Sequence, residues 1–178
     1  IGISLGVAVL IIVMSVMNGF RTELINKIVG FNAHITVKPY ENQIKIDNLK
    51  NTNLNLISEN LILSNSGEAI VIKKDNSKGV VLRGYLRDDF SKLNIIKDET
   101  FIGNRNNLTK NYISIGKELS FTLGLKIGDD ITIMSSSGVE TIIGSLPKKK
   151  TFTVQSLFES GLADFDNNVA FINLNTLE

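Results

Sequence analysis

The chain has 178 residues with 19 basic and 18 acidic side chains, and its net charge of +1 excludes the strong positive field that nucleic-acid binding requires. This length suffices for one domain of ordinary size, or for two small ones built on a common sheet. The sequence contains no cysteine, which excludes disulfide bonds and cysteine-ligated metal sites. That composition is compatible with the cytoplasm and with the bacterial periplasm.

The first twenty residues, IGISLGVAVLIIVMSVMNGF, contain no charged side chain. Twenty helical residues cover about 30 Å, which matches the hydrocarbon core of a bilayer. The run continues into the amphipathic segment RTELINKIVG, which disfavours a cleaved signal peptide. We therefore expect a transmembrane helix over residues 1–18, truncated at its start, and a stalk helix over residues 19–32. A buried core helix is the alternative.

The part of the chain after the stalk is predicted to be an α+β domain with a mixed, mostly antiparallel sheet. The segment AHITVKP, residues 33–39, alternates as a strand should and ends at a proline. An Asn-rich segment follows, with a short helical pattern near residues 48–52. Apolar runs over 69–72 and 80–82 flank a turn that contains Asp75, Asn76 and Gly79, which predicts a hairpin.

The second half of this domain contains regular patterns separated by polar segments. Residues 88–107 are predicted to form a short helix and a loop. A strand, a helix over 116–123, a glycine turn and a strand over 130–134 come next. Further strands are expected over 151–158 and 168–172, with a turn around Gly161 between them and a helix beginning at Asn173. We expect residues 33–178 to form one domain of two subdomains, with an insertion near 88–135.

Motifs that carry catalytic chemistry are missing from the sequence. There is no P-loop, nucleophile elbow, HExxH zinc motif or dinucleotide fingerprint, so any ATP hydrolysis has to be done by another chain. The single histidine, His34, is interpreted as structural. The pairs Asp88/Asp89 and Asp129/Asp130 are interpreted as helix-start and turn residues. We expect no catalytic residue, metal or cofactor in this chain.

The segment GVETIIGSLPKKKTFTV, residues 138–154, has the densest positive charge of the chain. About sixteen residues separate the predicted strands 130–134 and 151–158, whereas hairpin loops usually have two to five. The segment carries Val139, Ile142, Ile143 and Leu146, which a disordered tip would not favour. Two interpretations stay open, a wide hairpin with a solvated tip and a protruding arm that a partner grips.

Three segments resemble one family: VMSVMNGFRTELINKIVGFNAHITV, GKELSFTLGLKIGDDITIM and LPKKKTFTVQSLFESGLADFDNNVAFI. They are similar to the membrane permeases of the lipoprotein-releasing ABC transporter, LolC/LolE type, which have a MacB-like periplasmic core domain. The resemblance covers nearly the whole chain and is weakest between residues 42 and 63. It implies that residues 1 to about 17 lie in the bacterial inner membrane and that residues after about 18 lie in the periplasm.

The resemblance also implies a function and a set of partners. Such a permease extracts lipoproteins from the inner membrane and passes them to a LolA-like periplasmic chaperone for delivery to the outer membrane. It is a transport subunit and not an enzyme, because LolD-like ATPase subunits hydrolyse ATP, and it works with a second permease or as a homodimer. The alternatives are a MacB-like exporter, an FtsX-like activator of cell-wall hydrolases, and a membrane-anchored sensor or scaffold.

The family's arm recruits the chaperone, and by the resemblance it would span Ser135–Pro147 here, with Ile142 in place of an apex proline. The residues expected to bind the chaperone, from the arm and from the patch at its base, are Ile142, Ile143, Leu146, Pro147, Lys149 and Lys150. Acyl chains of the lipoprotein are expected to contact Met14, Met17 and Phe20, whose adaptable side chains suit varied partners. These three side chains would equally suit contact with bulk lipid.

Overall fold

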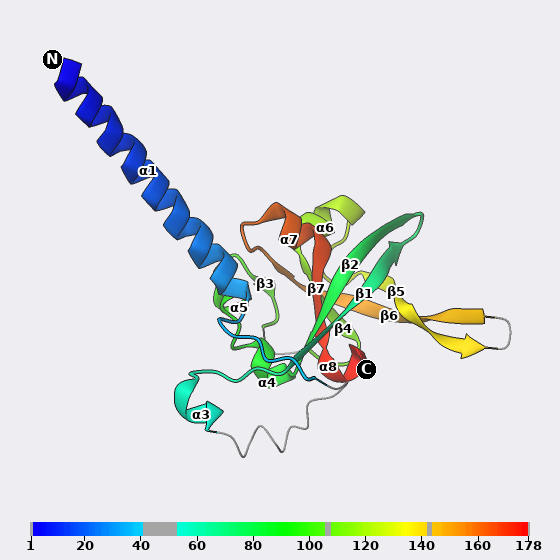
Figure 1. Ribbon diagram of the computed structural model, residues 1–178. Coiled ribbons are helices and arrows are strands. Elements are labelled where there is room, and N and C mark those ends of the chain that lie inside the picture. The colour runs from blue at the N-terminus through cyan, green and yellow to red at the C-terminus, as the bar shows by residue number, and fades with distance from the viewer. Residues whose placement is uncertain (1, 41–52, 106–107, 142–143, 178) are drawn as a thin grey trace. The chain divides into compact units, whose positions relative to one another are not determined.

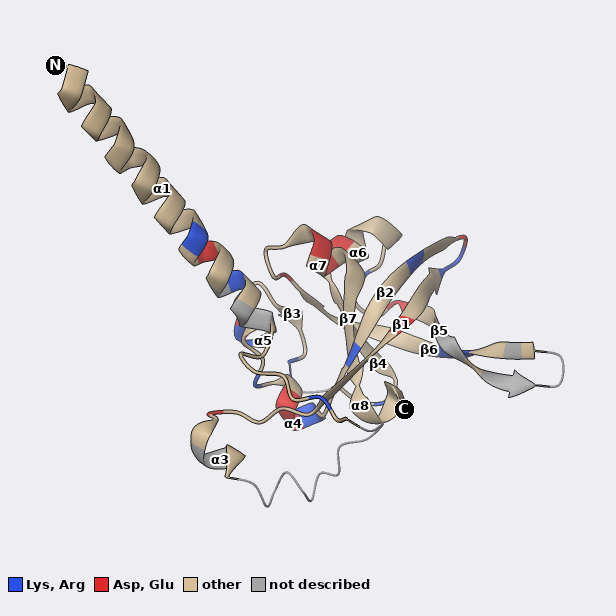
Figure 2. Cartoon of the chain, viewed as in Figure 1, with Lys and Arg blue, Asp and Glu red and all other residues tan. Residues whose placement is uncertain are grey.

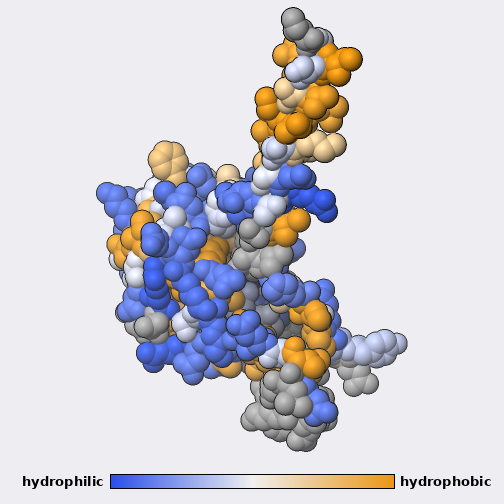
Figure 3. All heavy atoms as spheres, turned by 90° about the vertical axis from the view of Figure 1, so that its left-hand side faces the viewer, coloured by the Kyte–Doolittle hydropathy of each residue, from blue (hydrophilic) through white to orange (hydrophobic). Residues whose placement is uncertain are grey.

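The computed structural model describes residues 2–40, 53–105, 108–141 and 144–177, and the chain divides into two compact units, Ile1–Thr36 and Val37–Glu178. The first unit consists mainly of one continuous helix, α1 (Gly2–Phe31), drawn in blue in Figure 1. Its segment Gly2–Ile25 is long and apolar enough to cross a membrane, with a mean hydropathy of 2.2. Figure 3 shows these apolar side chains as an orange surface along the helix. That the last turns of α1 form a stalk outside a bilayer stays a prediction.

The strand predicted over residues 33–39 is wrong. The chain there is extended or bent without strand pairing, and the side chain of Ile35 is 82% exposed. A strand needs a neighbour that satisfies its backbone N–H and C=O groups, and side-chain alternation alone does not supply one. The helical pattern near 48–52 lies outside the described residues.

The second unit is a mixed α/β domain. Its strands are β1 (Ser64–Lys73), β2 (Asn76–Tyr85), β3 (Ile102–Gly103), β4 (Tyr112–Gly116), β5 (Asp130–Thr141), β6 (Gly144–Phe158) and β7 (Val169–Asn173). Its helices are α3 (Leu54–Ile57), α4 (Arg87–Phe90), α5 (Asn94–Lys97), α6 (Lys117–Leu123), α7 (Ala163–Asn168) and α8 (Leu174–Leu177). The predicted hairpin is confirmed as β1 and β2, with Lys73 opposite Asn76. The turn is tighter than predicted, because Asn76 and Gly79 belong to β2.

The sheet closes on itself. The strand order is β3-β6-β4-β7-β2-β1-β5, and an additional pairing between β5 and β6 joins one side of the order to the other. The strands β6, β4, β7, β2, β1 and β5 therefore form a barrel, and β3 lies along β6 outside the ring. The described ladders β2–β7 and β4–β6 are parallel, whereas the other ladders are antiparallel. Closure gives most of these backbones a neighbour on both sides.

The interior of the barrel is filled by apolar side chains, as in other small barrels. Every strand of the ring contributes alternate residues to this core, and helix α6 adds two leucines. The buried cluster comprises Ala69, Val71, Val80, Leu82, Ile113, Ile115, Leu119, Leu123, Leu125, Ile131, Ile133, Phe152, Val154, Ala170 and Ile172. The interior of the barrel is thus a packed hydrophobic core.

An aromatic cluster covers one sector of the barrel's outer surface. The ring of Phe171 on β7 lies 4.7 Å from that of Phe158, and 5.8 Å from those of Tyr85 and Phe90. Phe165 of α7 packs edge-on against Phe158 at 6.0 Å. Helices α4 and α7 are therefore held to this sector by aromatic contacts.

The segment between β6 and α7, predicted as a turn around Gly161, is fixed by the buried carboxylate of Asp166. Both side-chain oxygens of Asp166 accept from the backbone N–H of Ser160, at 3.0 and 3.1 Å. Gly161 has a φ of +75°, which glycine adopts readily. Burial raises the pKa of Asp166, and the nearby carboxylates of Glu159 and Glu118 act in the same direction, while the bonds from Ser160 oppose them.

Candidate functional site

The charged segment of the sequence is a two-stranded ribbon. The sequence predicted a long stretch between strands ending at Met134 and beginning at Thr151, but this stretch is mostly strand, because β5 continues to Thr141 and β6 begins at Gly144. In Figure 1 these paired ends, in yellow and orange, continue past the other strands. We call Gly138–Thr141 paired with Gly144–Pro147 the ribbon.

The residues predicted to bind a partner are distributed along β6. Leu146 lies on the ribbon and is 56% exposed, and Pro147 next to it is also exposed. Lys149 and Lys150 follow at the root of the ribbon and are exposed as well. Ile142 and Ile143, predicted at the tip, lie outside the described residues. The fold thus brings Leu146, Pro147 and the two lysines onto one strand.

The three consecutive lysines follow directly after Pro147 on β6 and are visible in blue in Figure 2. The ammonium group of Lys150 lies 5.3 Å from the ring centroid of Phe152, which permits a cation–π interaction. Proline lacks a backbone donor, and lysines on a strand discourage pairing with other sheets. Residues 146–150 of β6 therefore expose both apolar and charged side chains.

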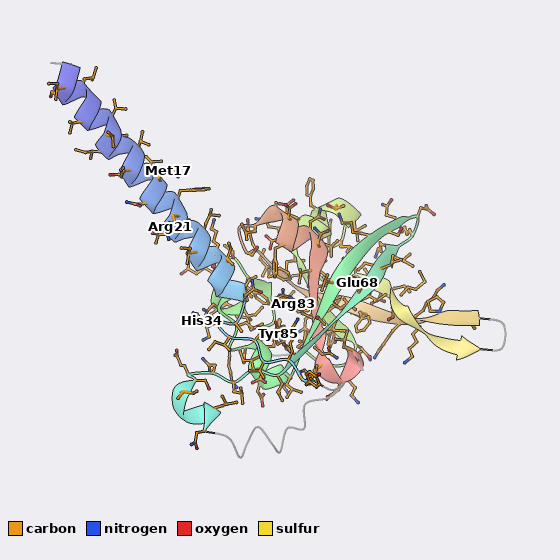
Figure 4. The ribbon with its side chains drawn as sticks, viewed as in Figure 1. Met17, Arg21, His34, Glu68, Arg83 and Tyr85 are labelled. Atoms are coloured by element: carbon orange, nitrogen blue, oxygen red, sulfur yellow. The ribbon has the colours of Figure 1, made fainter. Side chains whose placement is uncertain are left out.

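An apolar groove that the sequence did not predict lies on the outer face of the barrel at the root of the ribbon. We call it the outer groove, and it is lined by Glu68, Ala69, Ile70, Gly79, Val80, Val81, Met134, Ser135, Pro147 and Asn168. Ile70 and Val81 are 39% and 37% exposed. The available signal was that outward positions of β1 and β2 carry apolar residues. Figure 4 locates Glu68 on β1, and Arg83 and Tyr85 on β2.

The residues predicted to contact acyl chains belong to the other unit. Met14, Met17 and Phe20 lie on α1, and each side chain is 61% exposed. Figure 4 shows Met17 and Arg21 one turn apart, which places the first charge of the helix just after the apolar run. The helix thus exposes an apolar surface with adaptable methionine side chains, and this surface ends at the cation Arg21.

The acidic pair Asp129 and Asp130 makes local hydrogen bonds within the domain. One side-chain oxygen of Asp129 accepts from the backbone N–H of Lys126 at 3.1 Å, and this bond, together with the nearby Lys73, lowers the pKa of Asp129. Asp130 accepts from the hydroxyl of Thr153 at 2.7 Å. The turn interpretation is confirmed for Asp129, whereas Asp130 is the first residue of β5 and its contact with Thr153 joins β5 to β6. Among the described residues, no three His, Asp or Glu side chains form a group that could hold a metal ion.

Known proteins match this chain over 90% to 100% of its length. The protein at 27% identity from Xylella fastidiosa is named lipoprotein-releasing system transmembrane protein LolC, and the match covers 100% of this chain and 44% of that protein. The protein of the same name from Neisseria meningitidis serogroup B is 31% identical, with 97% and 43% covered. The one from Buchnera aphidicola is 28% identical, with 90% and 40% covered.

The chain spans less than half the length of these curated relatives. The family model for the MacB-like periplasmic core domain matches residues 1–178. That match includes the apolar helix, the barrel and the ribbon. The chain therefore belongs to the family of MacB-like periplasmic core domains.

Proposed function

We propose that this chain is the membrane anchor and periplasmic domain of a permease subunit in an ABC transporter that extracts lipoproteins from the inner membrane. The observation that carries the proposal is the match, over the whole chain, to proteins named LolC. The apolar helix ahead of the domain supports an inner-membrane location, with residues after about 18 in the periplasm. The names of the relatives favour this function over a MacB-like exporter or an FtsX-like activator.

The partners follow from the function. LolD-like ATPase subunits supply the energy, since this chain is proposed to be a transport subunit without a cofactor of its own. A second permease, or a second copy of this one, completes the membrane part. A LolA-like periplasmic chaperone receives the lipoprotein.

The ribbon is proposed to be the arm that recruits the chaperone, with Ile142 and Ile143 at its tip and Leu146 and Pro147 on its return strand. Burying a leucine side chain stabilises a complex by about 1.5–3 kcal/mol. An exposed ion pair from Lys149 or Lys150 contributes only about 0.2–1 kcal/mol. The apolar residues therefore provide most of the affinity, while the lysines orient an acidic partner surface.

Acyl chains are assigned to α1 and not to the barrel. The barrel interior is occupied by the side chains of its own core. A helix surface that carries Met14, Met17 and Phe20 can repack around chains of different shape. In this proposal, the helix α1 contacts the acyl chains of the lipoprotein, and the ribbon contacts the chaperone.

Site-specific photocrosslinking in the complete protein tests this function. A photoreactive residue replaces Ile142 or Leu146, and a control replaces Phe121, which is 86% exposed on α6. We expect an adduct with a lipoprotein chaperone from both ribbon positions and none from the control. Adducts only with a cell-wall hydrolase, or equal adducts from all three positions, would contradict the proposal.

A further inference from the structure

Strand β5 has two more residues than β6 at the root of the ribbon. Met134 pairs with Lys149, and the next described pair joins Gly138 to Pro147. The chain advances four residues on β5 but only two on β6 between these pairs, and the register shifts there. The excess lies within Ser135–Ser137. Extra residues on one strand form a β-bulge, which bends the strand and increases its twist.

The ladder on the other side of β5 ends at the same place. Strand β1 pairs with β5 from Ile72 opposite Thr132 to Ala69 opposite Ser135. Beyond Ser135, the described pairs of β5 are with β6 alone. The bulge therefore marks the point at which β5 leaves the wall of the barrel and becomes one strand of the ribbon.

The outer groove opens at this point too. It is lined by Ser135 of the bulge itself and by three residues next to the bulge, Ala69 on β1, Met134 on β5 and Pro147 on β6. An even number of extra residues also preserves the alternation of side chains, since the strand period is two. The bulge can thus turn the ribbon without exchanging its two faces.

We propose that the bulge at Ser135–Ser137 sets the direction in which the ribbon leaves the barrel, and that it is the positioning element of the ribbon. The core residues of β5 and all its described pairs with β1 except that of Ser135 with Ala69 come before the bulge in the chain, so we expect the barrel to fold without it. The consequence for partner binding rests on the proposed function, whereas the direction of the ribbon does not.

Spin-label distances in the complete protein test the proposal. The chain has no cysteine in this span, so Phe121→Cys labels one position on helix α6 and Leu146→Cys labels one position on the ribbon. Deleting Ser136 and Ser137 removes the bulge, because β5 and β6 then have the same number of residues between the flanking pairs. Leu146 lies three residues from Lys149, a lever of roughly 10 Å, so a change of direction of about 30° moves the label by about 5 Å. The double substitution of Ser136 and Ser137 by alanine keeps the length and should keep the parent distance.

A second variant tests the proposal even if the deletion variant misfolds. Inserting two residues between Pro147 and Lys148 lengthens β6, so that both strands again have the same number of residues between the flanking pairs. The spin label is placed on the first inserted residue, which lies three positions before Lys149, as Leu146 does in the parent. We expect a shift of about 5 Å in the same direction as for the deletion. A parent-like distance in either folded variant overturns the proposal. Unfolding of both variants overturns it as well, because the bulge would then be a requirement of the barrel.

Crosslinking from Ile142 supplies the functional readout. The deletion should lower the yield of the chaperone adduct about tenfold or more, while the alanine variant retains it. An undiminished yield in the deletion variant contradicts the positioning role. If the parent gives no adduct, the proposed function fails, and the label distances still decide whether the bulge directs the ribbon.

Discussion

Replacing Gly116 by alanine should destabilise the domain, because β4 and α7 approach each other too closely there for any side chain. A Cβ atom built on Gly116 would lie 2.6 Å from the Cα atom of Asp166, and the obstacle is backbone. Overpacking costs about 1–3 kcal/mol even where side chains yield, so we expect a loss of about 3 kcal/mol or more. For a chain of this size, that corresponds to a fall in Tm of roughly 6–12 °C.

Thermal unfolding of the protein in detergent measures this effect, with Gly79→Ala as the matched control. A Cβ atom at Gly79 meets nothing within 4 Å, and glycine within a strand costs about 0.5–1 kcal/mol relative to alanine. The control should therefore leave the Tm unchanged or raise it slightly. A Gly116→Ala variant whose Tm matches that of the control would refute the argument.

Three further predictions concern the core, the buried carboxylate and the lysines. Phe158→Ala should cost about 3–5 kcal/mol in chemical unfolding, because its buried ring contacts two other aromatic rings; a loss under 1 kcal/mol would contradict that packing. The pKa of the Asp166 carboxyl is raised in the folded state, so as the pH falls the folded protein binds a proton there before the unfolded chain does. The stability of the parent should therefore rise relative to that of Asp166→Asn as the pH falls from neutral through the folded pKa toward about 4. A pH-independent difference between the two proteins in urea unfolding would disprove this prediction. Lys149→Glu and Lys150→Glu should each weaken chaperone binding by about 1 kcal/mol or less at physiological salt, with a smaller effect at high salt, and a salt-independent loss in titration calorimetry would contradict the electrostatic origin.

The local elements of the domain could be predicted where sequence pattern and backbone pairing agree. The apolar runs that became β1 and β2 are adjacent in sequence, so a tight turn suffices to pair them. The helix α6 begins after Gly116 and ends at Gly124, whose φ of +61° is the usual helix stop. Residues 33–39 show the limit, because a strand pattern there finds no partner among the described residues.

The closure of the barrel could not be predicted, because it depends on pairings between distant segments. The pairing of β5 with β6 could be predicted, because the two strands follow each other in the sequence. Nothing local indicates that β5 also pairs with β1, or that the charged segment is strand up to Thr141 and again from Gly144. The candidate site, too, could be predicted only where it depends on local sequence. The lysines and Leu146 are visible in the sequence, but the outer groove is formed by residues of four strands, and the bulge appears only when the registers of β5 and β6 are compared.

The most direct test of the account is lipoprotein transfer by the complete transporter in proteoliposomes, with ATP and purified chaperone. Leu146→Asp places a charge on the exposed apolar side chain of the ribbon, far in sequence from any residue of α1. We predict that this variant retains ATP hydrolysis but delivers lipoprotein to the chaperone at least about tenfold more slowly than the parent. Transfer at the parental rate by Leu146→Asp would contradict the central claim that the ribbon receives the chaperone.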